Sequence, residues 1–218
     1  MGASCARGAE RRAVAPKSPA GAQCRRIGAA IARRSAAVDG SNPPFIHDGG
    51  ERPIYRPSDK TDRELEYSGK KKRHTLKNVL VVDEFGSIRF LSDTSEGRVH
   101  DKRIADEAKY TLPTASLRYQ DAGFQGFDLH GVLVMQPKKK PRHRTLTLQE
   151  KADNRRISSV RVRIEHVIGD LKRYRIIREV IRSGCSEFRD KVMETCCGLH
   201  NFRIRLKRKE CFENQIKP

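Results

Sequence analysis

The stretch from Ser158 to Tyr174 constrains the fold most, because its apolar residues recur at helical spacing. On this stretch, Arg161, Glu165 and Lys172 are separated by four and seven residues. At about 100° per residue, the three side chains share one face of a helix. A carboxylate between two cations is either an ion pair of a helix surface or part of a functional site. The apolar stripe beside it consists of Ile157, Val160, Ile164, Val167, Ile168 and Leu171.

The charge of the chain indicates a polyanionic partner. Its 218 residues carry a formal net charge of +19, and basic surfaces bind nucleic acid because counterions are released from the phosphates. A membrane surface is the other candidate for such a charge. No apolar run approaches the roughly 20 residues that span a bilayer, so we expect no transmembrane span. Of the two candidates we favour nucleic acid and expect no membrane partner. The six cysteines form no CxxC pair, which fits a reduced cytoplasmic protein and argues against metal binding by thiolates.

The composition divides the chain into three parts. Residues 1–42 are rich in Ala, Arg, Gly and Ser and nearly lack large apolar side chains, which predicts a disordered basic leader. This leader is either a basic arm on DNA or a non-native segment before a truncated domain, and we favour the second interpretation. Residues 43–208 are expected to form one α/β domain, followed by a C-terminal tail at 209–218.

Two apolar runs around a short glycine-containing turn predict a β-hairpin formed by residues 79–82 and 88–91. The first run is apolar throughout, as expected for a strand that is covered on both faces. Residues 45–48 are expected to form a short strand that ends at Asp48 and a glycine turn. The prolines in residues 51–57 predict an extended segment at a sheet edge.

Shorter signals predict the remaining elements of the chain. Thr147 and Glu150 have the spacing of a capping box, which predicts the start of the long helix. The elements expected are a charged loop at 58–66, a short helix at 100–109, short strands at 117–120 and 132–135, a long helix from 147 to 172, a helix or strand at 176–181 and a final helix at 186–208.

Three acids are candidates for a metal site. Asp48 and Asp121 each end a predicted strand, and Glu165 lies on the long helix. Carboxylates of this kind suit Mg²⁺ or Mn²⁺, and two such ions about 3.5–4 Å apart activate a water or a 3′-hydroxyl for phosphoryl displacement. Asp101 is the rival second acid, although the start of a helix favours an acid without any chemistry.

Two dense basic runs are candidates for holding a DNA backbone against such a site, because phosphate contacts position a duplex. The alternative is that both runs are solvated loops. The candidate cations in the runs and on the long helix are Lys70, Lys71, Lys72, Arg73, His74, Lys138, Lys139, Lys140, Arg161 and Lys172.

Five segments in the same order resemble the DDE transposases of bacterial insertion sequences, and most of all the insertion-sequence-five type. The resemblance covers residues 44 to 208. It implies an RNase H-like mixed sheet flanked by helices, with Asp48, Asp121 and Glu165 as the metal-binding triad. In such a sheet Asp121 lies beside the first strand, which favours it over Asp101. The segments are 48–54, 67–74, 97–102, 121–126 and the helix that bears Arg161, Glu165 and Lys172.

The chain departs from these relatives at several positions. Gly50 stands where relatives often carry Thr, Phe124 where they carry Tyr, and Ser158 where related groups carry Tyr. Relatives also have a long DNA-binding region before the first acid, where this chain has the leader. We therefore expect a truncated or decayed copy, or the downstream half of a two-frame gene.

The resemblance implies a DNA transposase that cleaves and joins DNA at insertion-sequence ends with two Mg²⁺ or Mn²⁺ ions. Its partners would be double-stranded terminal repeats and target DNA, contacted by Arg161 and Lys172. It would act in the cytoplasm at the nucleoid, with a homodimer as one possible assembly. Two alternatives stay open: a basic transposase remnant that binds nucleic acid without catalysis, and a structure-specific nuclease on the same fold.

Overall fold

The structure, a computed structural model, describes residues 43–216, with side chains through residue 209. The predicted leader at 1–42 lies outside the described residues. The elements are β1 (Pro44–Pro53), α1 (Lys60–Leu65), β2 (Tyr67–Ser68), β3 (Arg73–Asp83), β4 (Ile88–Leu91), β5 (Ser95–Glu96), α2 (Asp101–Ala108), β6 (Leu117–Gln120), the 3₁₀ turn η1 (Ala122–Phe124), β7 (Leu133–Met135), α3 (Leu148–Leu171), α4 (Arg175–Arg178) and α5 (Ser186–Ile216).

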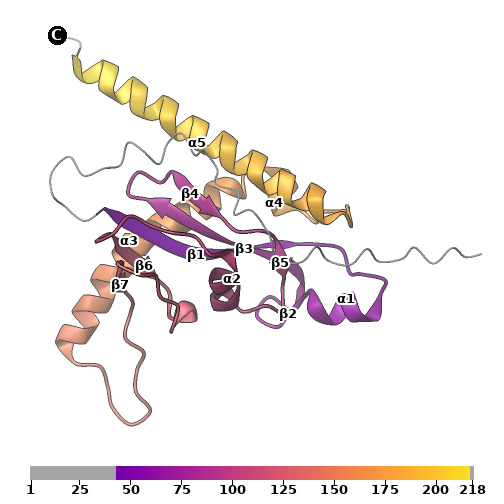
Figure 1. The fold of residues 1–218 in the computed structure, drawn as a ribbon, viewed down its shortest axis with the longest axis horizontal. Helices are drawn as coiled ribbons and strands as arrows, with labels where there is room; N and C mark the ends of the chain where they lie inside the picture. Colours follow the sequence, from indigo (N-terminus) through magenta and orange to yellow (C-terminus); the bar gives the residue numbers. More distant parts are fainter. Residues whose placement is uncertain (1–42, 217–218) are drawn as a thin grey trace, which may run out of the picture.

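A seven-stranded mixed sheet forms the centre of the molecule (Figure 1). Its main path runs β2-β3-β1-β6-β7, and β4 and β5 also pair with β3. β1 is antiparallel to β3, and β3 is antiparallel to β4, whereas β6 and β7 run parallel to β1. This order is that of an RNase H-like sheet. The predicted α/β fold, a mixed sheet flanked by helices, is confirmed.

The central run of β3 is covered on both faces, as its sequence predicted. Val79 and Val81 pack in a cluster with Ile104 of α2, whereas Leu80 and Val82 pack in a second cluster with residues of α3, α4 and α5. All four β3 side chains are fully buried. A strand with no polar face is stable only between two layers, so α2 covers one side of the sheet and α3, α4 and α5 cover the other.

The long helix α3 begins where the sequence predicted. Thr147 caps it, the side chains of Thr147 and Glu150 complete the capping box, and Lys172 stands at its C-terminal cap. The helix buries Ile164, Val167 and Leu171 against the sheet. The apolar stripe therefore faces the core and fixes which face of α3 points toward β1.

The first strand is longer than predicted. β1 does not end in a turn after Asp48 but continues through two glycines, and Gly49 pairs with Val79 and Gly50 with Asn78 of β3. A Cβ on Gly49 would lie 3.0 Å from Asp101 Cγ, and one on Gly50 would lie 3.0 Å from a Leu80 methyl group. The two glycines thus permit close packing on both faces of the strand. In the sequence alone, such a pair of glycines cannot be distinguished from a turn.

Two helical segments also differ from the prediction. Residues 58–66, expected to be a loop, contain α1, whose N-cap Asp59 accepts two backbone N–H groups of the first turn. The last helix, expected to end at 208, continues to Ile216 because no proline interrupts it before Pro218. Although α5 is long, neither it nor another helix of the described chain has an apolar stretch that could cross a membrane.

The two adjacent cysteines of α5, Cys196 and Cys197, are buried. Cys197 has no exposed surface, and burial raises the pKa of its thiol to about 12. Burial also raises the pKa of Cys196, whereas Cys185 is exposed. The thiolate is the nucleophile, so these two side chains lack both access and the reactive form near neutral pH.

We expect iodoacetamide at pH 8 to alkylate Cys185 in the folded protein while Cys196 and Cys197 stay unmodified. Peptide mapping by mass spectrometry distinguishes the sites, and the same treatment in denaturant should label all three. Equal labelling of Cys185 and Cys197 without denaturant would contradict the packing of α5 on the sheet.

Candidate active site

Two of the predicted acids lie side by side at the end of a strand pair. The parallel pairing of β1 with β6 ends at His47 and Gln120, so Asp48 and Asp121 are the next residues on neighbouring strands. Successive side chains of a strand point to opposite faces. Both acids therefore lie on the same face of the sheet as Ile46, which packs against α3.

A cation from α3 lies between these two acids. Arg161 Nη2 is 3.6 Å from Asp48 Oδ2, and Arg161 Nη1 is 3.4 Å from Asp121 Oδ1. The Arg161 side chain is only 14% exposed, against 21% for Asp48 and 48% for Asp121. The structure thus brings Asp48, Asp121 and Arg161 together, although they come from two strands and a helix far apart in the sequence.

The surroundings of Asp48 raise the pKa of its carboxyl group. Burial is the largest cause of a pKa raised above the ordinary range, and the charges of Asp121 and Asp101 raise the pKa further. The backbone N–H of Gly49, which donates to Asp48 Oδ1 over 2.8 Å, and the charge of Arg161 oppose this rise. A cation beside such an acid favours its charged form, which is the form that binds a metal.

Asp101, the rival acid, lies on the other face of β1. Its carboxylate lies where a side chain of Gly49 would point, which is the face of β1 opposite to that of Asp48. It also pairs with Lys77 Nζ at 3.3 Å. Strand β1 thus separates Asp101 from the guanidinium of Arg161. The structure groups Asp48 with Asp121 rather than with Asp101.

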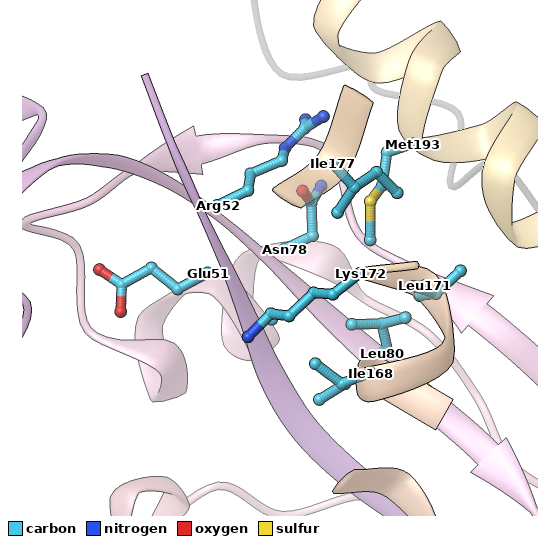
Figure 2. Close-up of a pocket in the computed structure, with 10 residues that line it drawn as sticks. Glu51, Arg52, Asn78, Leu80, Ile168, Leu171, Lys172, Ile177 and Met193 are labelled. Atoms are coloured by element: carbon cyan, nitrogen blue, oxygen red, sulfur yellow. The ribbon is translucent and has the colours of Figure 1, made fainter. Parts of the chain in front are cut away.

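Glu165 and Lys172 continue the same face of α3 beyond Arg161. Lys172 lines a small cavity with Gly50 and Glu51, and Figure 2 shows its side chain reaching toward β1. Glu165 is exposed and lies between the two cations, about 6 Å along the helix from Arg161. Among the described residues, no three Asp, Glu, His or Cys side chains are arranged to hold a metal ion. The role of Glu165 therefore stays a prediction.

The second basic run begins next to Asp121. Gln136 Nε2 donates to the Asp121 carbonyl oxygen over 2.9 Å, and the exposed lysines Lys138, Lys139 and Lys140 follow two residues later. Two hydrogen bonds between Lys138 and Asn154 tie this loop to α3. The run therefore presents cations at the edge of the site.

The first basic run lies farther away. Lys70, Lys71 and Lys72 are exposed in the turn before β3, followed by Arg73 and His74. Asp48 pairs with Leu80 of β3, seven residues from Arg73, which corresponds to about 23 Å along the strand. The structure thus brings the run at Lys138 to the acids and leaves the run at Lys70 outside the site.

A buried polar cluster that the sequence did not indicate lies behind the acids. The ring of His47 packs on Phe124 with centroids 4.0 Å apart, and His47 Nε2 is 3.3 Å from the Tyr110 hydroxyl. Arg118 stacks over Phe127 and donates to its carbonyl oxygen. Burial, with the nearby charge of Arg118, holds the pKa of His47 well below its ordinary value, so the ring is neutral. The cluster anchors the strand ends from which both acids project.

Comparisons with known proteins show the family of the chain. A family model described as DDE superfamily endonuclease matches residues 47–201. A probable transposase for insertion sequence element IS702 from Microchaete diplosiphon is 30% identical over 162 residues, which are 74% of this chain and 58% of the relative. The chain therefore spans little more than half of the length of that relative. No solved structure gives a significant match.

Proposed function

This chain belongs to the DDE superfamily of endonucleases, and from that premise we propose that it is a transposase domain that cleaves and joins double-stranded DNA with a divalent metal. The proposal depends on one observation, which is that the carboxylates of Asp48 and Asp121 lie side by side. Both carboxylates lie at the end of the parallel β1–β6 pairing, and one cation contacts both of them. Insertion-sequence ends would be the substrate, as the resemblance implies.

The residues present suit Mg²⁺ or Mn²⁺. Asp48 and Asp121 offer hard carboxylate oxygens around a space that already holds the positive charge of Arg161. We propose that Glu165 turns toward the two aspartates and completes the ligand set. When bound, two such ions would activate the attacking oxygen and stabilise the leaving oxygen of an in-line displacement.

The other roles fall to the cations around the acids. Lys138, Lys139 and Lys140 lie at the Asp121 edge of the site, and we propose that they hold the DNA backbone there. Lys172 would contact the backbone at the other end of the α3 face. Strand transfer needs two DNA ends in one assembly, and we propose that a homodimer of this chain holds them.

Incubation of the purified protein with supercoiled plasmid tests this function. We expect nicking with Mg²⁺ or Mn²⁺ and none in EDTA, because the reacting oxygens depend on the metal. A plasmid that carries inverted repeats should be cut at the repeat ends.

Two other results would replace the proposal. DNA binding that weakens steeply with salt, without cleavage in either metal, would indicate a non-catalytic remnant. Cleavage of branched DNA without preference for repeat ends would indicate a structure-specific nuclease.

A further inference from the structure

The guanidinium of Arg161 lies where the proposed reaction needs a metal. Its contacts of 3.4 and 3.6 Å to the two aspartates are longer than the about 2.7–2.9 Å of a good charge-assisted hydrogen bond. Its Nε is buried and has no hydrogen-bond partner among the described residues. Arg161 is therefore a partly buried cation whose hydrogen-bonding groups are incompletely used.

A divalent ion and this guanidinium would compete for the same oxygens. Two adjacent carboxylates repel each other, and a cation between them relieves the repulsion. A divalent ion on these oxygens would provide twice the charge and would repel the guanidinium. The close contacts of Arg161 with both acids cannot persist once a metal occupies that space.

We propose that Arg161 is the internal counter-ion of Asp48 and Asp121, and that a DNA phosphate draws it away so that a divalent ion can bind. This inference rests on the proposed function, because it assigns both aspartates to the metal. Arginine suits the exchange, since its planar fork binds phosphate with two parallel hydrogen bonds. Arg161 is thus a positioning residue, which acts on the reaction through the two aspartates and the metal that they bind.

The surroundings of Arg161 favour a phosphate arriving next to it. The run of Lys138, Lys139 and Lys140 starts at the Asp121 edge, so a backbone bound there lies beside the guanidinium. DNA and metal would then each increase the affinity for the other, because linkage makes such coupling reciprocal. The protein would bind the metal tightly only once DNA is in place.

Manganese binding tests this exchange, with electron paramagnetic resonance measuring free Mn²⁺ in the presence and absence of a short DNA duplex. We compare the unaltered protein with Arg161→Gln and with the matched control Arg163→Gln. Arg163 is exposed on the same helix, and its Nη1 donates to the Glu84 carbonyl oxygen over 3.4 Å. The control removes an equal charge without touching the acids.

For the unaltered protein and Arg163→Gln, we expect the duplex to tighten Mn²⁺ binding by a factor within the about 5–150-fold range of typical coupling between sites. Arg161→Gln should bind Mn²⁺ more tightly than either without DNA, and the duplex should add little. In EDTA, Arg161→Gln should melt at a lower temperature than the control, because two carboxylates lose their counter-ion. Mn²⁺ should then raise its melting temperature more than that of the control, which also shows that the variant is folded.

The proposal is overturned if Arg161→Gln binds Mn²⁺ no more tightly than the unaltered protein while that protein binds Mn²⁺ and nicks plasmid. In that case the proposed function stands and only the counter-ion role fails. If neither protein binds Mn²⁺, with or without the duplex, both proposals fail together.

Discussion

Replacing Asp48 with asparagine is expected to abolish metal-dependent nicking of DNA by this protein. Asparagine keeps the size of the side chain and an oxygen that accepts the Gly49 N–H, so the strand should fold unchanged. It removes the negative charge that would bind the metal. We expect the nicking rate to fall by more than about 100-fold, because loss of even an outer partner of a metal ligand costs about 10–100-fold.

Plasmid nicking measures this loss, with Asp106→Asn as the matched control. Asp106 pairs with Lys102 on an exposed face of α2, away from the acids, and its replacement should leave nicking unchanged. DNA binding by Asp48→Asn, followed by fluorescence anisotropy, should be equal to that of the parent or slightly tighter, since one negative charge is lost. A rate equal to that of the parent would show that Asp48 is not a metal ligand.

Replacing Gly97 with alanine is expected to cause a large loss of stability. The added Cβ would lie 2.4 Å from Thr75 Oγ1 and 2.7 Å from the carbonyl oxygens of Glu66 and Thr75. The carbonyl groups belong to the backbone, and Thr75 N donates to the Glu66 carbonyl oxygen, so neither can move aside without cost. Overpacking of this kind costs about 1–3 kcal/mol or more.

Urea unfolding followed by circular dichroism measures the effect, with Gly198→Ala as the control. Gly198 lies within α5 and has no atom within 4 Å of an added Cβ. The same substitution there should stabilise the protein by about 0.5–1 kcal/mol, because alanine favours the helix. Equal effects at the two glycines would contradict the close approach of Gly97 to Thr75 of β3 and to Glu66.

Several elements followed from signals between residues that are near in sequence. The capping box of Thr147 and Glu150 and the apolar stripe after it predicted α3 correctly. The fully apolar run at 79–82 predicted a strand buried on both faces. Both signals act within one element, so they do not depend on how the elements pack.

Other features depended on contacts that local signals do not reveal. The glycines after Asp48 were wrongly assigned to a turn, because their function is to make room for Asp101 and Leu80 on opposite faces of β1. The short helix α1 was assigned to a loop, since five of its six residues are charged or polar, so it carries no apolar stripe and only the Asp59 cap marks it.

For the site, the residue types and their order were sufficient to suggest a DDE endonuclease, and the family is confirmed. The positions of individual side chains were not predictable in the same way. That Lys138 lies near Asp121 while Lys70 lies far from it follows from the parallel pairing of β6 with β7 and from the length of β3.

Local patterning was enough to identify α3 and the hairpin, because helix caps and periodicity act over a few residues. Only the packed molecule decides that Arg161 contacts both Asp48 and Asp121. Such a contact requires the β1–β6 register and the rotation of α3 together, and each is set by burial across the whole core. Charge pairs between distant segments have no signature in the order of residues, since the fold brings them together.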